Sequence, residues 1–145
     1  MADRHPSPPG PAVDPALVEF AVDIAREAGA LTLRYFRRSD LAIEGKDDGT
    51  PVTVADRGAE RLLRDRIGEA FGDDAIVGEE EADVSGSSGR TWILDPIDGT
   101  QSFVHGVPLF SNLVALEDKH GPAVGVINVP ALGERVWAGR GLCCF

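Results

Sequence analysis

Apolar residues recur with a helical period in two stretches of the first half of the chain. The first stretch has apolar positions three or four residues apart: Leu17, Ala21, Ile24, Ala28, Leu31 and Tyr35. This spacing predicts a helix that starts at Asp14 and Pro15, a favourable N-cap and first helical residue, and reaches the basic residues within 34–38. The second stretch predicts a helix from Thr53, with Leu62, Leu63, Ile67 and Phe71 along its apolar face.

The rest of the chain consists of short apolar runs separated by turn residues, which is typical of β-strands. Strands are predicted over 41–44, at the end of 73–78, over 91–94, and as an antiparallel series over 109–118, 122–129 and 134–138. Turns or loops are expected at 46–51, 119–121 and 130–133. Two helices followed by a largely antiparallel sheet predict an α+β fold built in layers.

Composition indicates one folded domain after a short N-terminal arm. The 145 residues are 43% hydrophobic and 26% charged, as in soluble globular proteins. Residues 1–14 are expected to form a disordered Pro-rich arm, and residues 15–145 are expected to form the folded part. There is no apolar run of membrane-spanning length and no apolar segment typical of a signal peptide, so a cytoplasmic location is expected.

Negative charge is concentrated in one segment. The net charge is −10, and residues 73–98 hold eight acidic residues against one basic residue, Arg90. A basic face that binds nucleic acid is therefore not expected. An anionic substrate would be repelled by this segment unless metal ions reverse the local field.

The acidic segment ends in Asp-Pro-Ile-Asp-Gly-Thr, residues 95–100, directly after the apolar run 92–94. A turn at the end of a strand can aim Asp95 and Asp98 into one small volume, and Glu79 supplies a third carboxylate. Buried carboxylates are costly unless they are paired, and oxygen-rich clusters bind hard cations such as Mg²⁺, commonly together with substrate phosphates. The pattern therefore favours metal-assisted phosphoryl chemistry.

The last two residues of this hexad suit an anion. Gly99 allows the backbone to approach a phosphate closely, and a short helix over 99–104 would offer free N–H groups. Thr100 adds a hydroxyl that can orient a water molecule. One acidic residue at a strand end is commonly structural, whereas three beside a Gly-Thr turn indicate a functional site.

These residues belong to a set of motifs that resembles the inositol monophosphatase superfamily. The motifs are Thr50-Pro51-Val52-Thr53-Val54-Ala55-Asp56, Gly78-Glu79-Glu80, the run from Trp92 to Thr100, Phe103-Val104-His105-Gly106, and Gly125-Val126-Ile127-Asn128-Val129-Pro130. The resemblance extends from about Pro15 to Phe145. It implies a Mg²⁺-dependent phosphatase of small phosphate monoesters with an αβαβα-layered fold, commonly a homodimer.

The resemblance also implies roles for individual residues. It places one Mg²⁺ on Glu79, Asp95 and the backbone carbonyl of Ile97, and a second Mg²⁺ between Asp95 and Asp98. Glu79 and Thr100 would activate the attacking water, with Asp56 supporting Thr100. The amides of Gly99 and Thr100 would hold the phosphate, with Lys46 near it.

Within the superfamily, several motifs look closest to the histidinol-phosphatase branch, which acts in histidine biosynthesis. They are Asp98-Gly99-Thr100-Gln101-Ser102-Phe103, the run 113–118, the run 53–60 and Pro130-Ala131-Leu132-Gly133-Glu134-Arg135. Inositol-1-phosphate and nucleotide 3′-phosphate phosphatases share the metal core and remain alternatives.

Length sets this chain apart from the superfamily, whose members are roughly twice as long and carry a further metal-binding Asp in a Trp-Asp motif. That motif is absent here, so the chain is interpreted as an N-terminal half, and a truncated, non-catalytic half-domain is the alternative from a different class. A haloacid-dehalogenase phosphatase is disfavoured because its Asp-x-Asp spacing does not match residues 95–98. A structural Ca²⁺ domain is disfavoured because no EF-hand loop is present.

Overall fold

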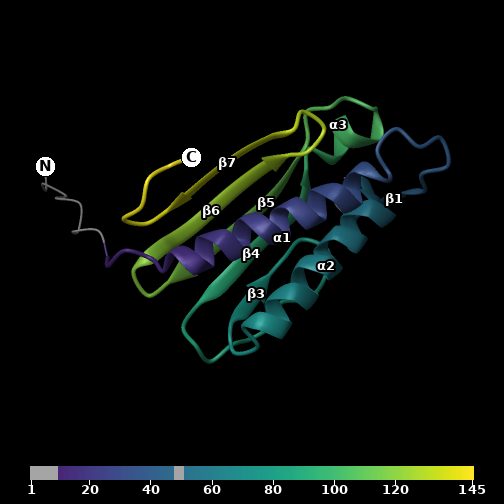
Figure 1. The fold of residues 1–145 in the computed structure, drawn as a ribbon. Coiled ribbons are helices and arrows are strands. Elements are labelled where there is room, and N and C mark those ends of the chain that lie inside the picture. Colours follow the sequence, from purple (N-terminus) through teal and green to yellow (C-terminus); the bar gives the residue numbers. More distant parts are fainter. Residues whose placement is uncertain (1–9, 48–50) are drawn as a thin grey trace, which may run out of the picture.

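The computed structural model describes residues 10–47 and 51–145. Its helices are α1 (Pro15–Leu33), α2 (Val54–Ala70) and α3 (Thr100–Val104). Its strands are β1 (Ile43–Gly45), β2 (Pro51–Thr53), β3 (Ala75–Val77), β4 (Thr91–Asp98), β5 (Ser111–Asp118), β6 (Gly121–Val129) and β7 (Glu134–Gly139). Helices α1 and α2 precede a largely antiparallel sheet (Figure 1), which confirms the predicted α+β class.

The main sheet has five strands in the order β3-β4-β5-β6-β7. β3 pairs with β4 in parallel, and every later pair in this sheet is antiparallel, as expected for strands joined by short turns. α1 lies across β5, β6 and β7, and α2 lies against β4, so the two helices cover one face of the sheet (Figure 1). β1 and β2 form a separate antiparallel pair that leads into α2.

Both long helices begin where their caps predict. Oδ1 of Asp14 accepts a hydrogen bond from the amide of Ala16 at 2.9 Å. Thr53 and Asp56 form a capping box at the start of α2, in which each side chain accepts from the other's backbone N–H. Because these caps satisfy N–H groups that a helix start leaves unpaired, they fix the first residue of each helix.

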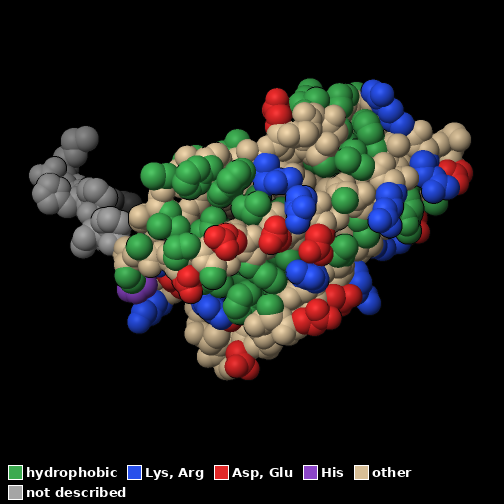
Figure 2. All heavy atoms as spheres, in the orientation of Figure 1, with side chains coloured by type: hydrophobic (Ala, Val, Ile, Leu, Met, Phe, Trp, Pro, Cys, Tyr) green, Lys and Arg blue, Asp and Glu red, His purple; other side chains and the backbone are tan. Residues whose placement is uncertain are grey.

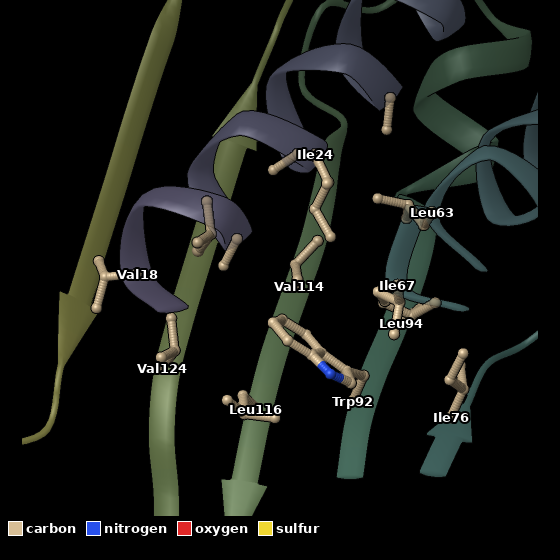
Figure 3. Close-up of a cluster of buried hydrophobic side chains, with 14 of the residues drawn as sticks. Val18, Ile24, Leu63, Ile67, Ile76, Trp92, Leu94, Val114, Leu116 and Val124 are labelled. Atoms are coloured by element: carbon tan, nitrogen blue, oxygen red, sulfur yellow. The ribbon is translucent and has the colours of Figure 1, made fainter. Parts of the chain in front are cut away.

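The hydrophobic core fills the space between the sheet and the pair α1 and α2 (Figure 3). Trp92 of β4 is fully buried there, and its indole nitrogen donates to Oδ2 of Asp74 at 2.9 Å. Residues along β4 alternate, because Trp92 and Leu94 belong to this core whereas Ile93 is 38% exposed. Each large apolar side chain in the core contributes about 1.5–3 kcal/mol to the free energy of unfolding.

Several predicted boundaries differ from the structure, and three of them concern the segments 41–53 and 91–98. The strand expected over 41–44 is β1 at Ile43–Gly45, and β2 begins at Pro51, in the segment expected to be a loop. Residues 48–50 of that predicted loop lie outside the described residues. The strand expected over 91–94 continues to Asp98 as β4, because β5 continues to pair with it beyond Leu94.

The predicted disordered arm also needs a correction in its last part. Residues 1–9 lie outside the described residues, but Val13 is 7% exposed and packs in the core. Its amide donates to the carbonyl of Arg140 at 2.9 Å, and Nε of Arg140 donates to the carbonyl of Pro11 at 2.9 Å. These contacts attach residues 11–14 to the end of β7.

The other face of the sheet is open in the described part of the chain and is largely apolar. A groove of about 600 Å³ runs along it, with Val77, Ile93, Ile127 and Val136 among its lining residues, each between 38% and 51% exposed. Figure 2 shows the helix-covered side, where acidic and basic side chains gather over α1 and α2. No helix in the described ranges is both long enough and apolar enough to cross a membrane.

We expect Asp118→Asn to lower the free energy of unfolding at neutral pH and to lose this effect in acid. Nη2 of Arg140 donates to Oδ2 of Asp118 at 2.5 Å, and the amide of His120 donates to Oδ1. These hydrogen bonds lower the pKa of Asp118 to about 2. Because the folded pKa lies below the ordinary value of 3.8, the stabilisation is complete above that value and is lost as the pH falls towards 2.

Urea unfolding across this pH range measures the difference between wild type and variant. The matched control is Glu117→Gln, which removes the neighbouring exposed carboxylate of β5. A stability difference for Asp118→Asn that is the same at about pH 2 and at neutral pH would contradict the assignment of this ion pair.

Candidate active site

The hexad 95–100 connects the end of β4 to α3. The pairing of β4 with β5 shifts register between Asp95 and Asp98, so the strand is irregular where the two carboxylates lie. Gly99 follows with a φ of 84° as the N-cap of α3, and a Cβ at this position would lie 3.1 Å from the carbonyl oxygen of Leu109. Only glycine adopts this backbone at little cost, so the predicted short helix depends on it.

Asp95 is the site carboxylate that a bound cation would stabilise most directly. Its Oδ1 atom is buried and finds no hydrogen-bond partner among the described residues. Burial, followed by the negative charges of Glu79 and Asp98, raises the pKa of Asp95 to about 7. A buried, unpaired carboxylate oxygen is costly in a folded protein, and a bound cation would remove that cost.

Asp56 connects the start of α2 to the hexad. Its Oδ2 atom accepts from the amide and hydroxyl of Thr53 at 2.8 Å and 2.6 Å. Its Oδ1 atom lies 3.1 Å from the hydroxyl of Thr100, which also lies 3.0 Å from the carbonyl oxygen of Ile97. Asp56 is 1% exposed, so this carboxylate is held inside the protein by hydrogen bonds on both oxygens.

Lys46 lies beside Glu79 and Glu80. Its ammonium nitrogen is 2.6 Å from Oε1 of Glu80 and 3.5 Å from Oε2 of Glu79. The side chain of Glu80 is 4% exposed, and that of Glu79 is 54% exposed. Burial raises the pKa of Glu80 against the opposing effect of Lys46. Lys46 therefore contacts both glutamates of the Gly-Glu-Glu motif.

The structure brings the predicted site residues together in two groups. Asp56, Thr100 and the carbonyl of Ile97 are joined by hydrogen bonds, and Lys46 pairs with Glu79. Asp95 is close enough to both groups for Asp56, Glu79 and Lys46 to influence its pKa. Asp98 and Gly99 are exposed at the end of β4. Across the described ranges, no three acidic, His or Cys side chains form a ready-made metal site.

Sequence reasoning missed two buried amides that support the hexad. Asn112 of β5 donates to the carbonyl of Pro96 at 2.8 Å, and Asn128 of β6 donates to Oδ1 of Asn112 at 2.8 Å. Asn128 also donates to the carbonyl of Ala25 in α1 at 3.1 Å. Both amides are at most 2% exposed. A signal existed in the sequence, because each Asn interrupts an apolar strand.

Comparison with known proteins agrees with this fold. The model of the inositol monophosphatase family matches residues 15–145, and the chain belongs to that family. It is 50% identical over 128 residues to a histidinol-phosphatase of Chlorobaculum parvum, covering 88% of this chain and 49% of that protein. It is 45% identical over 126 residues to a histidinol-phosphatase of Mycobacterium tuberculosis, covering 87% of this chain and 48% of that protein.

A solved structure supports the same conclusion. The extragenic suppressor protein suhB of Bartonella henselae superposes with a TM-score of 0.85 at 32% identity, over 90% of this chain and 51% of that one. The described residues therefore adopt the fold of about half of that structure. The chain spans about half the length of the curated relatives it matches.

Proposed function

We propose that this chain provides the metal-binding and water-orienting part of a Mg²⁺-dependent phosphatase that acts on a small phosphate monoester. The observation that carries the proposal is Asp95, whose buried Oδ1 atom has no partner in the described part of the chain and whose charge lies close to those of Glu79 and Asp98. Hard oxygen ligands of this kind suit Mg²⁺. The residues present therefore fit the metal that the family resemblance implies.

Each site residue has a role in this proposal. Glu79, Asp95, Asp98 and the carbonyl of Ile97 would hold Mg²⁺, which when bound polarises phosphoryl oxygens and makes water a better nucleophile. The remaining chemistry rests on side chains that orient the water and the phosphate.

Thr100 and Asp56 would orient the attacking water. The Asp56 carboxylate oxygen at 3.1 Å accepts a hydrogen bond from the hydroxyl of Thr100, which leaves a lone pair of the threonine oxygen free to accept a hydrogen bond from water. Glu79, with its side chain 54% exposed, would serve as the general base. Amides of Gly99 and Thr100, together with the Lys46 ammonium, would hold the phosphate by charge and hydrogen bonds.

Histidinol phosphate is the substrate we prefer. Support comes from the two relatives named histidinol-phosphatase, at 50% and 45% identity, and from the motifs around the hexad. Inositol 1-phosphate and a nucleotide 3′-phosphate are the alternatives within the family. We also propose a cytoplasmic location, and a homodimer for a full-length protein.

The open face of the sheet favours one second candidate function. This alternative is a non-catalytic half-domain that binds metal. The open apolar face of the sheet, next to Glu79 and Asp95, supports this reading, since a sheet face of this kind is normally covered in a catalytic domain.

We expect the 145-residue chain alone to bind Mg²⁺ weakly and to turn over substrate far more slowly than the ~10 s⁻¹ of an ordinary enzyme. The test combines calorimetric titration of Mg²⁺ with phosphate release from histidinol phosphate and inositol 1-phosphate at millimolar Mg²⁺. Ordinary turnover from a monodisperse sample would show that this chain is sufficient for catalysis. Failure to bind Mg²⁺ would remove the proposed function.

A further inference from the structure

We propose that Glu60 and Arg64 of α2 are positioning residues. They hold the Glu79-Glu80-Glu81 segment at a fixed distance from the hexad. The inference rests on the proposed function, because it concerns where the Glu79 carboxylate lies relative to Asp95. Neither residue contributes a group to the predicted ligand set. Their role is to fix the backbone that carries a ligand.

The carboxylate of Glu60 binds the Glu79-Glu80-Glu81 segment by accepting hydrogen bonds from backbone N–H groups of that segment. Its side chain is fully buried, and its oxygens accept from the amide of Glu80 at 2.8 Å and the amide of Glu81 at 3.0 Å. Nε of Arg64 also donates to Glu60, at 2.8 Å. The carboxylate therefore satisfies two amides that directly follow Glu79, using charge-assisted hydrogen bonds.

The guanidinium of Arg64 binds the same part of the chain by donating to the backbone carbonyl groups of residues 81 and 82. Its side chain is 8% exposed, with Nη2 donating to the carbonyl of Glu81 at 3.0 Å and Nη1 to that of Ala82 at 3.1 Å. The ion pair thus binds backbone N–H groups and backbone carbonyl groups of the chain that follows β3. A planar guanidinium is suited to this arrangement because its donors are fixed in one fork.

Gly78 allows the close approach of this pair. A Cβ atom at position 78 would overlap Oε1 of Glu60 and lie 2.8 Å from Nη2 of Arg64. The glycine of the Gly-Glu-Glu motif is therefore explained by the ion pair behind it, without reference to a bound ligand.

One helix holds both parts of the candidate site. Asp56, Glu60 and Arg64 are four residues apart in α2, which places them along one side of the helix at intervals of about 6 Å. Asp56 accepts from Thr100 of the hexad, and the other two hold residues 80–82. Because α2 is rigid over this length, it fixes the separation between Glu79 and the hexad.

The energetics of the pair agree with a positioning role. Two buried charges lose solvation on folding, and replacing such a pair with apolar residues is often neutral or stabilising. Glu60 and Arg64 therefore contribute a defined backbone geometry more than net stability.

The first test measures hydrogen exchange of the amides of Glu80 and Glu81 in the full chain without metal. We expect Glu60→Gln to accelerate their exchange by about 10-fold or more, because a glutamine cannot accept from both amides and from Arg64. Arg64→Lys, which keeps the charge but loses the fork, is the second variant should Glu60→Gln not fold. The matched control is Asp74→Asn, which removes another buried carboxylate paired with an arginine, Arg90.

The second test measures Mg²⁺ affinity by calorimetry for the same proteins. We expect Glu60→Gln to weaken binding by about 10-fold, as for other residues that orient metal ligands, and Asp74→Asn to leave it unchanged despite its own loss of stability. Unchanged exchange at Glu80 and Glu81 would overturn the proposal, and so would faster exchange with wild-type Mg²⁺ affinity. Absence of Mg²⁺ binding in the wild type would instead remove the proposed function, while exchange still decides whether Glu60 holds the segment.

Discussion

We expect Asp95→Asn to bind Mg²⁺ at least ~100-fold more weakly than the wild type and, at alkaline pH, to have a higher free energy of unfolding. The metal effect follows because Asp95 is the one residue assigned to both metal positions. The stability effect follows because the wild-type charge is partly buried, lies near Glu79 and Asp98, and has an Oδ1 atom without a partner in the described ranges. A neutral amide removes the repulsion, so function and stability change in opposite directions.

The stability gain from Asp95→Asn should depend on pH. The folded pKa of about 7 lies above the ordinary value of 3.8, so the folded chain holds a proton that the unfolded chain releases between these values. Wild-type stability therefore falls as the pH rises through this window, and the variant does not share this loss. The gain should be absent near pH 4 and complete above about pH 7.

Urea unfolding at several pH values, with Mg²⁺ titration in parallel, measures both effects. Asp98→Asn is the matched control, because Asp98 is exposed and its replacement should weaken Mg²⁺ binding with little gain in stability. Equal Mg²⁺ binding by the wild type and Asp95→Asn would remove the assignment of two metal positions to this site.

The second large effect is expected at Thr100. In a complete domain, for example a chimaera in which residues 15–145 replace the matching half of the Chlorobaculum parvum relative, Thr100→Val should lower kcat by about 100-fold with little change in KM. The hydroxyl is proposed to orient water for the chemical step and contributes little to ground-state binding.

Two further variants separate this role from folding. Thr100→Ser keeps the hydroxyl and should keep most of the activity. Asp56→Ala should also lower kcat, and it should cost about 1 kcal/mol or more of stability because Asp56 takes part in the capping box of α2. If the two side chains act as a unit, the double variant loses no more activity than the worse single variant. A rise in KM alone would mean that Thr100 binds substrate.

The sequence predicted the helices better than the small strands, for physical reasons. Asp14 and Thr53 carry their capping information in the residues beside them, so both helix starts were predicted. β1 and β2 have three residues each and are formed by pairing with one another, which leaves no periodic signal in either segment. The strand predicted over 91–94 stopped before the hexad, yet β4 continues to Asp98, because the register shift accommodates Pro96, a residue without an N–H group.

The candidate site shows the same division. Carboxylates next to a Gly-Thr turn could be recognised by their spacing, and the resemblance supplied roles for them. Glu60 could not be recognised as a support, because a glutamate four residues before an arginine on a helix is usually an exposed ion pair. The full burial of Glu60 is set by the chain after β3, which packs over it only in the folded state.

The alternation along β4 also divides the mutations that this strand can accept into two classes. Substitutions at Trp92 and Leu94 reach the core under α1 and α2, so they affect how much folded protein is present. Substitutions at Ile93 and Asp95 reach the open groove, so they leave the core intact and change what the folded protein can bind. In a saturation mutagenesis experiment, abundance would therefore be lost at Trp92 and Leu94, and metal binding at Asp95, which lies on the other face of the same strand.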